Sequence, residues 1–160
     1  MSHCARHIFL HFVWATKYRQ PFVTPAIERR LYRMVEAKVR ELGCRVVAIN
    51  GMPDHVHLLV LMSTTITPAD LMHKVKGASS GFARNSLRQG EAFSWQHGYG
   101  VFSVGQKGVP RVVAYIANQK THHASNDVWD NWEEVPEDTD FTAEGGGGLS
   151  APELDVYRPG

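Results

Sequence analysis

The sequence predicts an α+β fold, in which an antiparallel sheet has the element order β-α-β-β-α-β and one further helix follows the last strand. Three observations support this prediction. Four short runs are rich in apolar, aromatic and β-branched side chains. The second and third of these runs are separated only by a tight turn, which is typical of an antiparallel hairpin. The longer segments outside that hairpin have helical periodicity and helix-start signals.

The first strand is predicted over residues 7–16, where HIFLHFVWAT combines apolar, aromatic and β-branched side chains. The first helix begins after Thr24, a favoured N-cap residue, with Pro25 at the first helical position. Gly43 ends this helix. Its apolar side chains recur close to the helical period and predict the buried face: Ile27, Leu31, Met34, Val35, Val39 and Leu42.

Residues 45–50 and 55–61 are predicted to be the second and third strands, joined by a tight turn over residues 51–54. A capping box from Thr67 to Asp70 then opens the second helix. The apolar face of this helix is formed by Leu71, Val75, Ala78 and Phe82.

Residues 99–104 are predicted to be the fourth strand, and Pro110 opens a third helix that runs to about Ala124. The complete order is the split βαβ, ferredoxin-like pattern with an extra C-terminal helix that carries Tyr115. We expect the helices to cover one face of the antiparallel sheet.

Charge is distributed unevenly along the chain. Residues 1–124 have 16 Lys and Arg against 6 Asp and Glu, whereas residues 125–160 have 1 against 10. We therefore expect one domain over 1–124, suited to a polyanion, and a separate acidic, glycine-rich, partly disordered tail over 125–160. The tail either aids solubility, which is the favoured interpretation, or competes with the polyanion for the basic face.

Other features of the composition indicate an ordinary globular protein. No apolar run approaches the roughly 20 residues of a membrane-spanning helix. The N-terminus lacks the features of a signal peptide, so we expect a cytoplasmic protein with no membrane partner. Cys4 and Cys44 lie far apart and are expected to be free thiols.

The segment MPDHVHLLV places His55 and His57 on the same face of the third strand, because side chains alternate along a strand. Val56 and its alternate neighbours then point into the helix-covered core. Two adjacent imidazoles can bind a divalent cation, and a hard cation such as Mg²⁺ or Mn²⁺ would add oxygen ligands. The spacing alone fits a pair of surface histidines equally well.

The segment YIANQ on the third helix places Tyr115 and Gln119 four residues apart, on one helical face. Gln119 offers an amide oxygen as a third metal ligand, and Tyr115 offers a phenolate nucleophile. Tyrosine ordinarily titrates near pH ~10, so a nearby cation would have to favour the phenolate. Without the histidines, an amphipathic helix whose tyrosine covers the core would be the preferred interpretation.

These two motifs, in this order and on these elements, resemble the single-tyrosine HUH transposases of the insertion sequence 200/605 family, to which the REP-associated tyrosine transposases are closely related. HUH denotes the two histidines that flank a hydrophobic residue, here within MPDHVHLLV. The resemblance extends over about residues 7–123 and includes the segments FVWATKYRQP, VKGASS and WQHGYGVFSV.

The resemblance implies that His55, His57 and Gln119 bind Mg²⁺ or Mn²⁺ and that Tyr115 attacks a DNA phosphate. Such attack gives a 5′-phosphotyrosine and a free 3′-hydroxyl, which later rejoins strands without ATP. The resemblance also implies a homodimer that binds single-stranded DNA hairpins near the ends of an insertion sequence. Whether the tyrosine helix serves its own site or the site of a partner subunit is left open by the sequence.

Six further residues are candidate DNA contacts. Three follow the first strand, where a tyrosine could stack on a base, and three lie on the second helix. An ordinary polar loop and a solvated helix face are the respective alternatives. The six residues are Lys17, Tyr18, Arg19, Lys74, Lys76 and Arg84.

For five other residues a structural role is favoured over a chemical one. His122 and His123 could reach a metal or a phosphate, but the end of a helix also favours histidine. Trp95 and Tyr99 could stack on bases, but core or edge packing is preferred. Asp54 could accept a hydrogen bond from a ligand histidine, but shaping the turn is preferred.

We therefore predict a transposase that cleaves and rejoins single-stranded DNA. One alternative is a regulatory protein that binds DNA or RNA hairpins without cutting them, which tight hairpin binding without metal-dependent cleavage would favour. Another is a metal-dependent phosphohydrolase, which turnover of nucleotides but not of oligonucleotides would favour.

Overall fold

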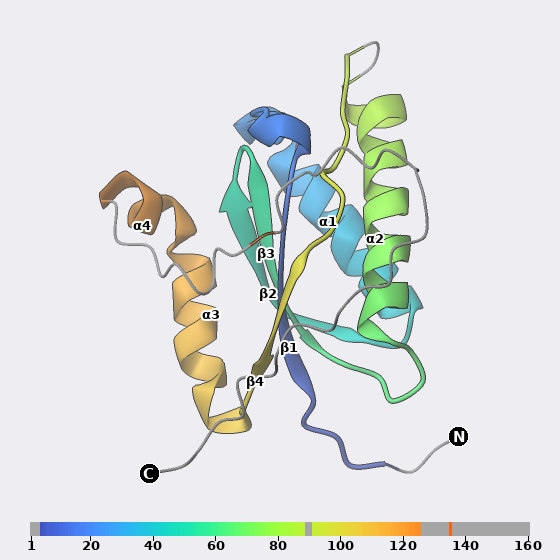
Figure 1. Cartoon of the computed structure of the whole chain (residues 1–160), viewed down its shortest axis with the longest axis vertical. Helices are drawn as coiled ribbons and strands as arrows, with labels where there is room; N and C mark the ends of the chain where they lie inside the picture. Colours follow the sequence, from blue (N-terminus) through green and yellow to red (C-terminus); the bar gives the residue numbers. More distant parts are fainter. Residues whose placement is uncertain (1–3, 89–90, 126–134, 136–160) are drawn as a thin grey trace, which may run out of the picture.

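The computed structural model describes residues 4–88, 91–125 and 135. Its centre is a four-stranded antiparallel sheet with the strand order β2-β3-β1-β4, which confirms the predicted α+β class. β1 and β3 are therefore the two inner strands (Figure 1). The strands are β1 (Phe9–Ala15), β2 (Arg45–Met52), β3 (His55–Leu61) and β4 (Gly100–Val104).

Two long helices, α1 (Pro25–Glu41) and α2 (Pro68–Phe82), cover one face of the sheet. The predicted start signals of both helices are confirmed. Thr24 and Thr67 are the N-caps, and Thr67 Oγ1 accepts a hydrogen bond of 3.1 Å from the backbone amide of Asp70. The larger core lies between these helices and the sheet, and its largest side chains include Phe12, Trp14, Leu31, Leu58, Leu71 and Met72.

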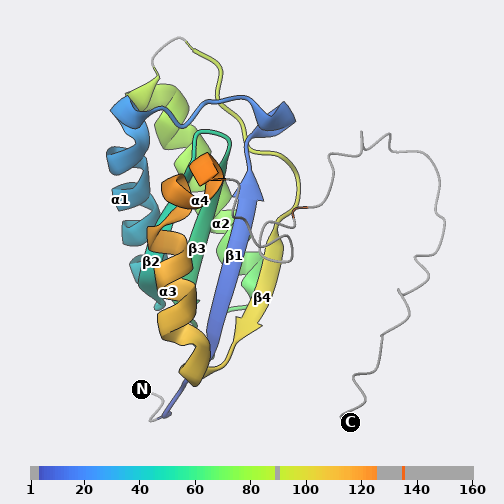
Figure 2. The ribbon, with the colours of Figure 1, turned by 90° about the vertical axis from the view of Figure 1, so that its left-hand side faces the viewer.

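The C-terminal helical segment covers the opposite face of the sheet, so the expectation that all helices share one face was wrong (Figure 2). This segment is also not one helix over 110–124. It consists of α3 (Val109–Ala117) and α4 (Gln119–Ser125), with a break at Asn118. A smaller core lies beneath it, formed by Leu59, Val112 and Ile116.

Two residues near the end of β2 and the start of α4 explain the break. Asn50 Nδ2 donates a hydrogen bond of 3.1 Å to the carbonyl of Ala117, a group that would otherwise accept an amide of the continuing helix. Lys120 Nζ donates to Asn50 Oδ1 and to the carbonyl of Gly51, and it also pairs with Glu28. These contacts hold the start of α4 against the β2–β3 turn.

The remaining elements are short. They are η1 (Lys17–Arg19), the π-helical turn η2 (Ala83–Leu87) and η3 (Gln106–Gly108). Within the described part of the chain, no helix is long and apolar enough to cross a membrane. Both cysteines are free, as expected. The predicted acidic tail lies almost wholly outside the described residues.

Gly51 allows the β2–β3 hairpin to close tightly. A Cβ atom at this position would lie 2.2 Å from the backbone oxygen of His55. We therefore expect Gly51→Ala to lower the free energy of unfolding by about 1–3 kcal/mol, measured by denaturant titration. Gly77→Ala is the matched control, because nothing lies within 4 Å of its added Cβ in the middle of α2. The control should be neutral or stabilising by roughly 0.5–1 kcal/mol. Equal effects of the two substitutions would contradict this explanation.

Candidate functional site

β3 presents His55 and His57 to the face of the sheet that α3 and α4 cover. Val56, Leu58 and Val60 alternate with them and lie in the core on the α1–α2 side, so the predicted division of the strand is confirmed. His57 is fully buried and His55 is 3% exposed. The histidines are thus not on an open surface, because the C-terminal helical segment lies over them.

His55 is held between Asp54 and α4. Its Nδ1 lies 2.7 Å from Asp54 Oδ1, and its Nε2 lies 3.2 Å from Gln119 Oε1. Asp54 therefore has both of the roles considered for it, in the turn and beside His55. Its backbone oxygen accepts from the Thr16 amide, while its carboxylate contacts a candidate metal ligand.

His57 lies deeper, and its ring contacts those of His55, His11 and Tyr115. Its Nδ1 is 2.8 Å from His11 Nε2, across the β1–β3 pairing. The rings of His57 and Tyr115 pack edge to face, with their centroids 5.9 Å apart and their planes at 75°. The fold thus places the candidate nucleophile beside one of the two histidines.

α3 and α4 each supply one of the predicted residues. Tyr115 lies near the end of α3 and is 2% exposed, and Gln119 is the first residue of α4 and is fully buried. The expectation of a shared face on one helix was wrong in its geometry, because the break at Asn118 separates the two residues. Their convergence is nevertheless observed, since Gln119 reaches His55 and Tyr115 reaches His57.

His123 also belongs to this cluster, although the sequence favoured a helix-end role for it. Its Nε2 lies 3.1 Å from Gln119 Oε1, and its ring centroid lies 4.8 Å from that of His55. The α4 helix therefore brings two side chains, one turn apart, to the same edge of the histidine pair.

The donor set fits a hard divalent cation. His55 and His57 each have their Nδ1 atom in contact with a neighbouring group, so their Nε2 atoms are the ones that can bind a metal. A separation of 3.2 Å between His55 Nε2 and Gln119 Oε1 suits two adjacent ligands of an octahedral Mg²⁺, which lie roughly 3 Å apart at its usual bond length. Among the described residues, no group of three His, Cys, Asp or Glu side chains could hold a metal, so the fit depends on the Gln119 amide.

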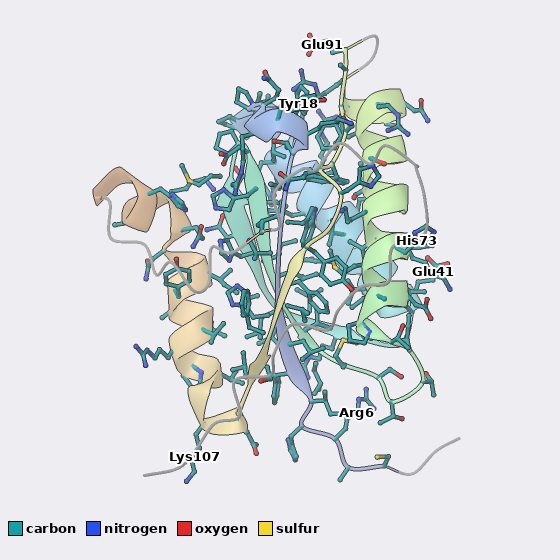
Figure 3. All side chains as sticks on the ribbon, in the orientation of Figure 1. Arg6, Tyr18, Glu41, His73, Glu91 and Lys107 are labelled. Atoms are coloured by element: carbon teal, nitrogen blue, oxygen red, sulfur yellow. The ribbon has the colours of Figure 1, made fainter. Side chains whose placement is uncertain are left out.

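A cleft of about 500 Å³ opens beside this cluster. It is lined by Arg19, Asp54, His55 and His123, together with Pro21, Met52 and Pro53. Arg19 Nη1 lies 3.9 Å from Asp54 Oδ2, so the cleft has a cationic group beside its carboxylate. Tyr18 is 66% exposed at the same end of the molecule (Figure 3). The predicted Lys17–Arg19 segment thus lies next to the site.

Of the three candidates expected on the second helix, Lys74 and Lys76 lie on α2, whereas Arg84 lies on η2, just beyond the end of α2. None of them is brought to this site, because α2 covers the opposite face of the sheet. Lys76 Nζ donates to the backbone carbonyls of Gln96 and Gly98, and Arg84 donates to that of Phe93. Both therefore hold the 93–98 segment, whereas Lys74 is exposed. Trp95 is buried in the core, as its preferred interpretation expected.

Three residues of the site and its surroundings were missed in the sequence: His11, Asn50 and Lys120. His11 had a visible signal, since it is a polar residue inside an otherwise apolar strand and this strand was predicted to be buried. Asn50 and Lys120 had none, because their partners lie about 70 residues away in the chain.

The Asp54 carboxylate gives this region a pH dependence. Burial raises the pKa of Asp54, but the hydrogen bond with His55 and the charges of His55 and Arg19 outweigh burial, so the pKa lies below its ordinary value of 3.8. A lowered folded-state pKa stabilises the protein above the unfolded value, and this stabilisation is lost as the pH falls through the folded pKa. The difference in melting temperature between wild type and Asp54→Asn should therefore shrink as the pH is lowered from 6 to below about 3. A difference that is constant over this range would contradict the assignment.

Comparisons with known proteins identify the family of the chain. Residues 4–119 match the family model described as "Transposase IS200 like". The ISDra2 transposase TnpA of Deinococcus radiodurans is 24% identical over 114 residues, which cover 68% of this chain and 81% of that protein.

Solved structures give the same result for the fold. A crystal structure from Deinococcus radiodurans, assigned as a transposase, superposes with a TM-score of 0.59 at 26% identity and covers 74% of this chain and 96% of its own. A REP-associated tyrosine transposase bound to a REP hairpin superposes with a TM-score of 0.58 at 16% identity, over 94% of this chain and 100% of its own. Because the family model matches well over half of the sequence, the chain belongs to the IS200-like transposase family.

Proposed function

We propose that this transposase cleaves and rejoins single-stranded DNA through a covalent bond between Tyr115 and a 5′-phosphate. The observation that carries the proposal is the convergence of four side chains from one chain: the Tyr115 ring lies against His57, and Gln119 Oε1 lies beside His55 Nε2. A protein that only binds hairpins has no need of a phenol next to a set of metal-binding atoms.

In the proposed cleavage step, the Tyr115 oxygen attacks the scissile phosphorus and the bond from phosphorus to the 3′-oxygen breaks. The phenol loses one proton and the leaving 3′-oxygen gains one, so the step is balanced. The new bond is a 5′-phosphotyrosine. Attack of a free 3′-hydroxyl on that bond reverses the chemistry and joins two strands, so no other source of energy is needed.

His55, His57 and Gln119 would hold Mg²⁺ or Mn²⁺, which when bound supplies a positive charge that polarises the phosphate and favours the phenolate. The protein residues provide the rest. Asp54 contacts Nδ1 of His55 and His11 contacts Nδ1 of His57, so each would orient one ligand histidine. Burial of the cluster keeps water away from the nucleophile.

Tyr115 is covered in this structure, so access has to come from the cleft lined by Arg19 and His123 or from displacement of the C-terminal helical segment. The segment rests on a small core and on the contacts of Asn50 and Lys120. This core is smaller than the one beneath α1 and α2, so displacing the C-terminal helical segment breaks fewer apolar contacts than displacing those two helices.

The substrate we propose is a DNA hairpin with a single-stranded flank. The REP-associated relative is bound to a hairpin, and the balance of +10 over residues 1–124 suits nucleic acid. A homodimer remains a prediction from the family resemblance, and a cytoplasmic location remains a prediction from the sequence composition.

The η1 segment should contact the single-stranded flank. We expect Arg19→Ala to reduce the slope of log affinity against log salt concentration by about 0.7, the value for one phosphate contact on single-stranded DNA. Tyr18→Ala should weaken binding by about 1–3 kcal/mol without changing that slope, because stacking is not ionic. Fluorescence anisotropy over a salt series measures both quantities. If Tyr18→Ala alters the slope and Arg19→Ala does not, these two roles are wrong.

The direct test is incubation of the protein with labelled hairpin oligonucleotides and Mn²⁺, followed by denaturing electrophoresis. The proposal expects a labelled band at the mass of the protein plus the DNA fragment, and no such band with EDTA. Tight hairpin binding without a metal-dependent adduct would instead identify a non-cleaving regulatory protein. Turnover of nucleotides without activity on oligonucleotides would identify a phosphohydrolase.

A further inference from the structure

We propose that His11 is a positioning residue that fixes the tautomer of His57, so that the His57 Nε2 lone pair faces the cation. This inference rests on the proposed function, because it takes His57 to be a metal ligand. It assigns a role to a residue outside both sequence motifs.

The contact is short, buried and between neighbouring strands. His11 lies on β1 directly opposite Leu59, two residues beyond His57, so both imidazoles point to the α3 face of the sheet. His11 Nε2 and His57 Nδ1 are 2.8 Å apart, and both residues are fully buried. The ring centroids are 5.0 Å apart with the planes tilted by 36°.

The chemistry of neutral imidazole turns this contact into a constraint. Each neutral ring has one N–H donor and one lone pair, and a hydrogen bond needs one of each. If His57 Nδ1 donates to His11 Nε2, the Nε2 atom of His57 keeps its lone pair and can bind a metal. If the proton lies on His11 Nε2 instead, His57 must carry its own proton on Nε2 and cannot bind. Only the first arrangement is compatible with metal binding through Nε2.

Asp54 makes the corresponding contact with His55. The group behind His55 is thus a carboxylate and the group behind His57 is an imidazole, and the different burial of the two positions explains this difference. Asp54 is about one-third exposed, so water can solvate its charge. A carboxylate at the fully buried position of His11 would carry a large desolvation penalty. A neutral imidazole accepts the same hydrogen bond without burying a charge. It also would not neutralise the positive charge of a bound cation, so that charge would still act on a DNA phosphate.

The first test needs no variant and no metal. Long-range ¹H–¹⁵N correlation spectra of histidine-labelled wild-type protein, in EDTA at a pH where the rings are neutral, report which nitrogen of each ring carries the proton. We expect His57 to be protonated on Nδ1. Protonation of His57 on Nε2 would overturn the inference.

The second test measures Mn²⁺ affinity by electron paramagnetic resonance. His11→Leu removes the acceptor while filling the space, and it should weaken binding about 10- to 100-fold, as is typical for the loss of a group that supports a metal ligand. His11→Gln places an amide oxygen near the same point and should restore most of the affinity. Equal affinities of wild type and a folded His11→Leu variant would also overturn the inference. Should His11→Leu fail to fold, the tautomer measurement still decides.

His57→Ala separates this inference from the proposed function. If His57→Ala leaves Mn²⁺ affinity unchanged, the metal site itself is wrong. If His57→Ala abolishes Mn²⁺ binding while His11→Leu does not affect it, only the role of His11 is wrong.

Discussion

Replacing Tyr115 by Phe should abolish the covalent protein–DNA adduct while leaving hairpin binding within about twofold of wild type. The variant removes only the phenolic oxygen, which is the attacking atom in the proposed step. The ring remains, and with it the contact with His57 and the packing beneath α3. Loss of one buried hydroxyl should change the free energy of unfolding by only about 1 kcal/mol. Denaturing electrophoresis measures the adduct, and fluorescence anisotropy measures binding.

Tyr99→Phe is the matched control for this experiment. Tyr99 is partly buried and packs near Phe12 in the core on the α1–α2 side, with ring centroids 6.1 Å apart. It packs on the face of the sheet opposite the histidine cluster, so the adduct should form at the wild-type level. An adduct formed by Tyr115→Phe would refute the nucleophile assignment. Loss of the adduct in both variants would point to a general effect on folding.

The sheet and the histidine pair could be predicted because the signals that specify them are local. Alternation along β3 determines which residues share a face, and it separated His55 and His57 from Val56 and Leu58 correctly. The N-cap and proline signals after Thr24 and Thr67 placed the starts of both long helices where the structure has them, at Pro25 and Pro68.

The C-terminal segment could not be predicted in the same way, because its geometry depends on distant partners. The apolar pattern reads as one helix, yet Asn50 on β2 occupies the carbonyl of Ala117, and the helix breaks at Asn118. No spacing within residues 110–124 records that contact. The position of His123 depends on this break, because the break sets the direction of α4. Since the break was not visible in the sequence, a helix-end role was favoured for His123.

His11 illustrates a different limit. A histidine in an apolar strand signals a buried polar group, but the sequence does not say which group satisfies it. The answer depends on the register between β1 and β3, which places His11 diagonally beside His57. Register is set by the whole sheet, so the pairing becomes visible only in three dimensions.

Replacing Gln119 by Leu should have the second large effect, a loss of Mn²⁺ affinity of at least tenfold, or about 1.4 kcal/mol. The reason is that Gln119 Oε1 is the one oxygen among the three proposed ligand atoms, and a hard cation binds oxygen in preference to nitrogen. Leucine has a similar size, so the buried position stays filled. Adduct formation should fall with affinity at low Mn²⁺ concentration and recover partly when Mn²⁺ is raised.

Two further variants decide whether that loss reflects the ligand atom or the packing of α4. Gln119→Glu keeps an oxygen at the same point and should retain Mn²⁺ binding, whereas a purely structural role would make it as damaging as leucine, because it buries a charge. Gln96→Leu removes a buried glutamine on the α2 side of the molecule and should leave Mn²⁺ affinity unchanged.

An excess of Mn²⁺ should rescue the adduct in Gln119→Leu but not in Tyr115→Phe. Tyr115 lies on α3 and Gln119 on α4, so Gln119→Leu should leave the nucleophile in place. Failure of that rescue, in a variant that still folds, would mean that Gln119 does more than bind the cation.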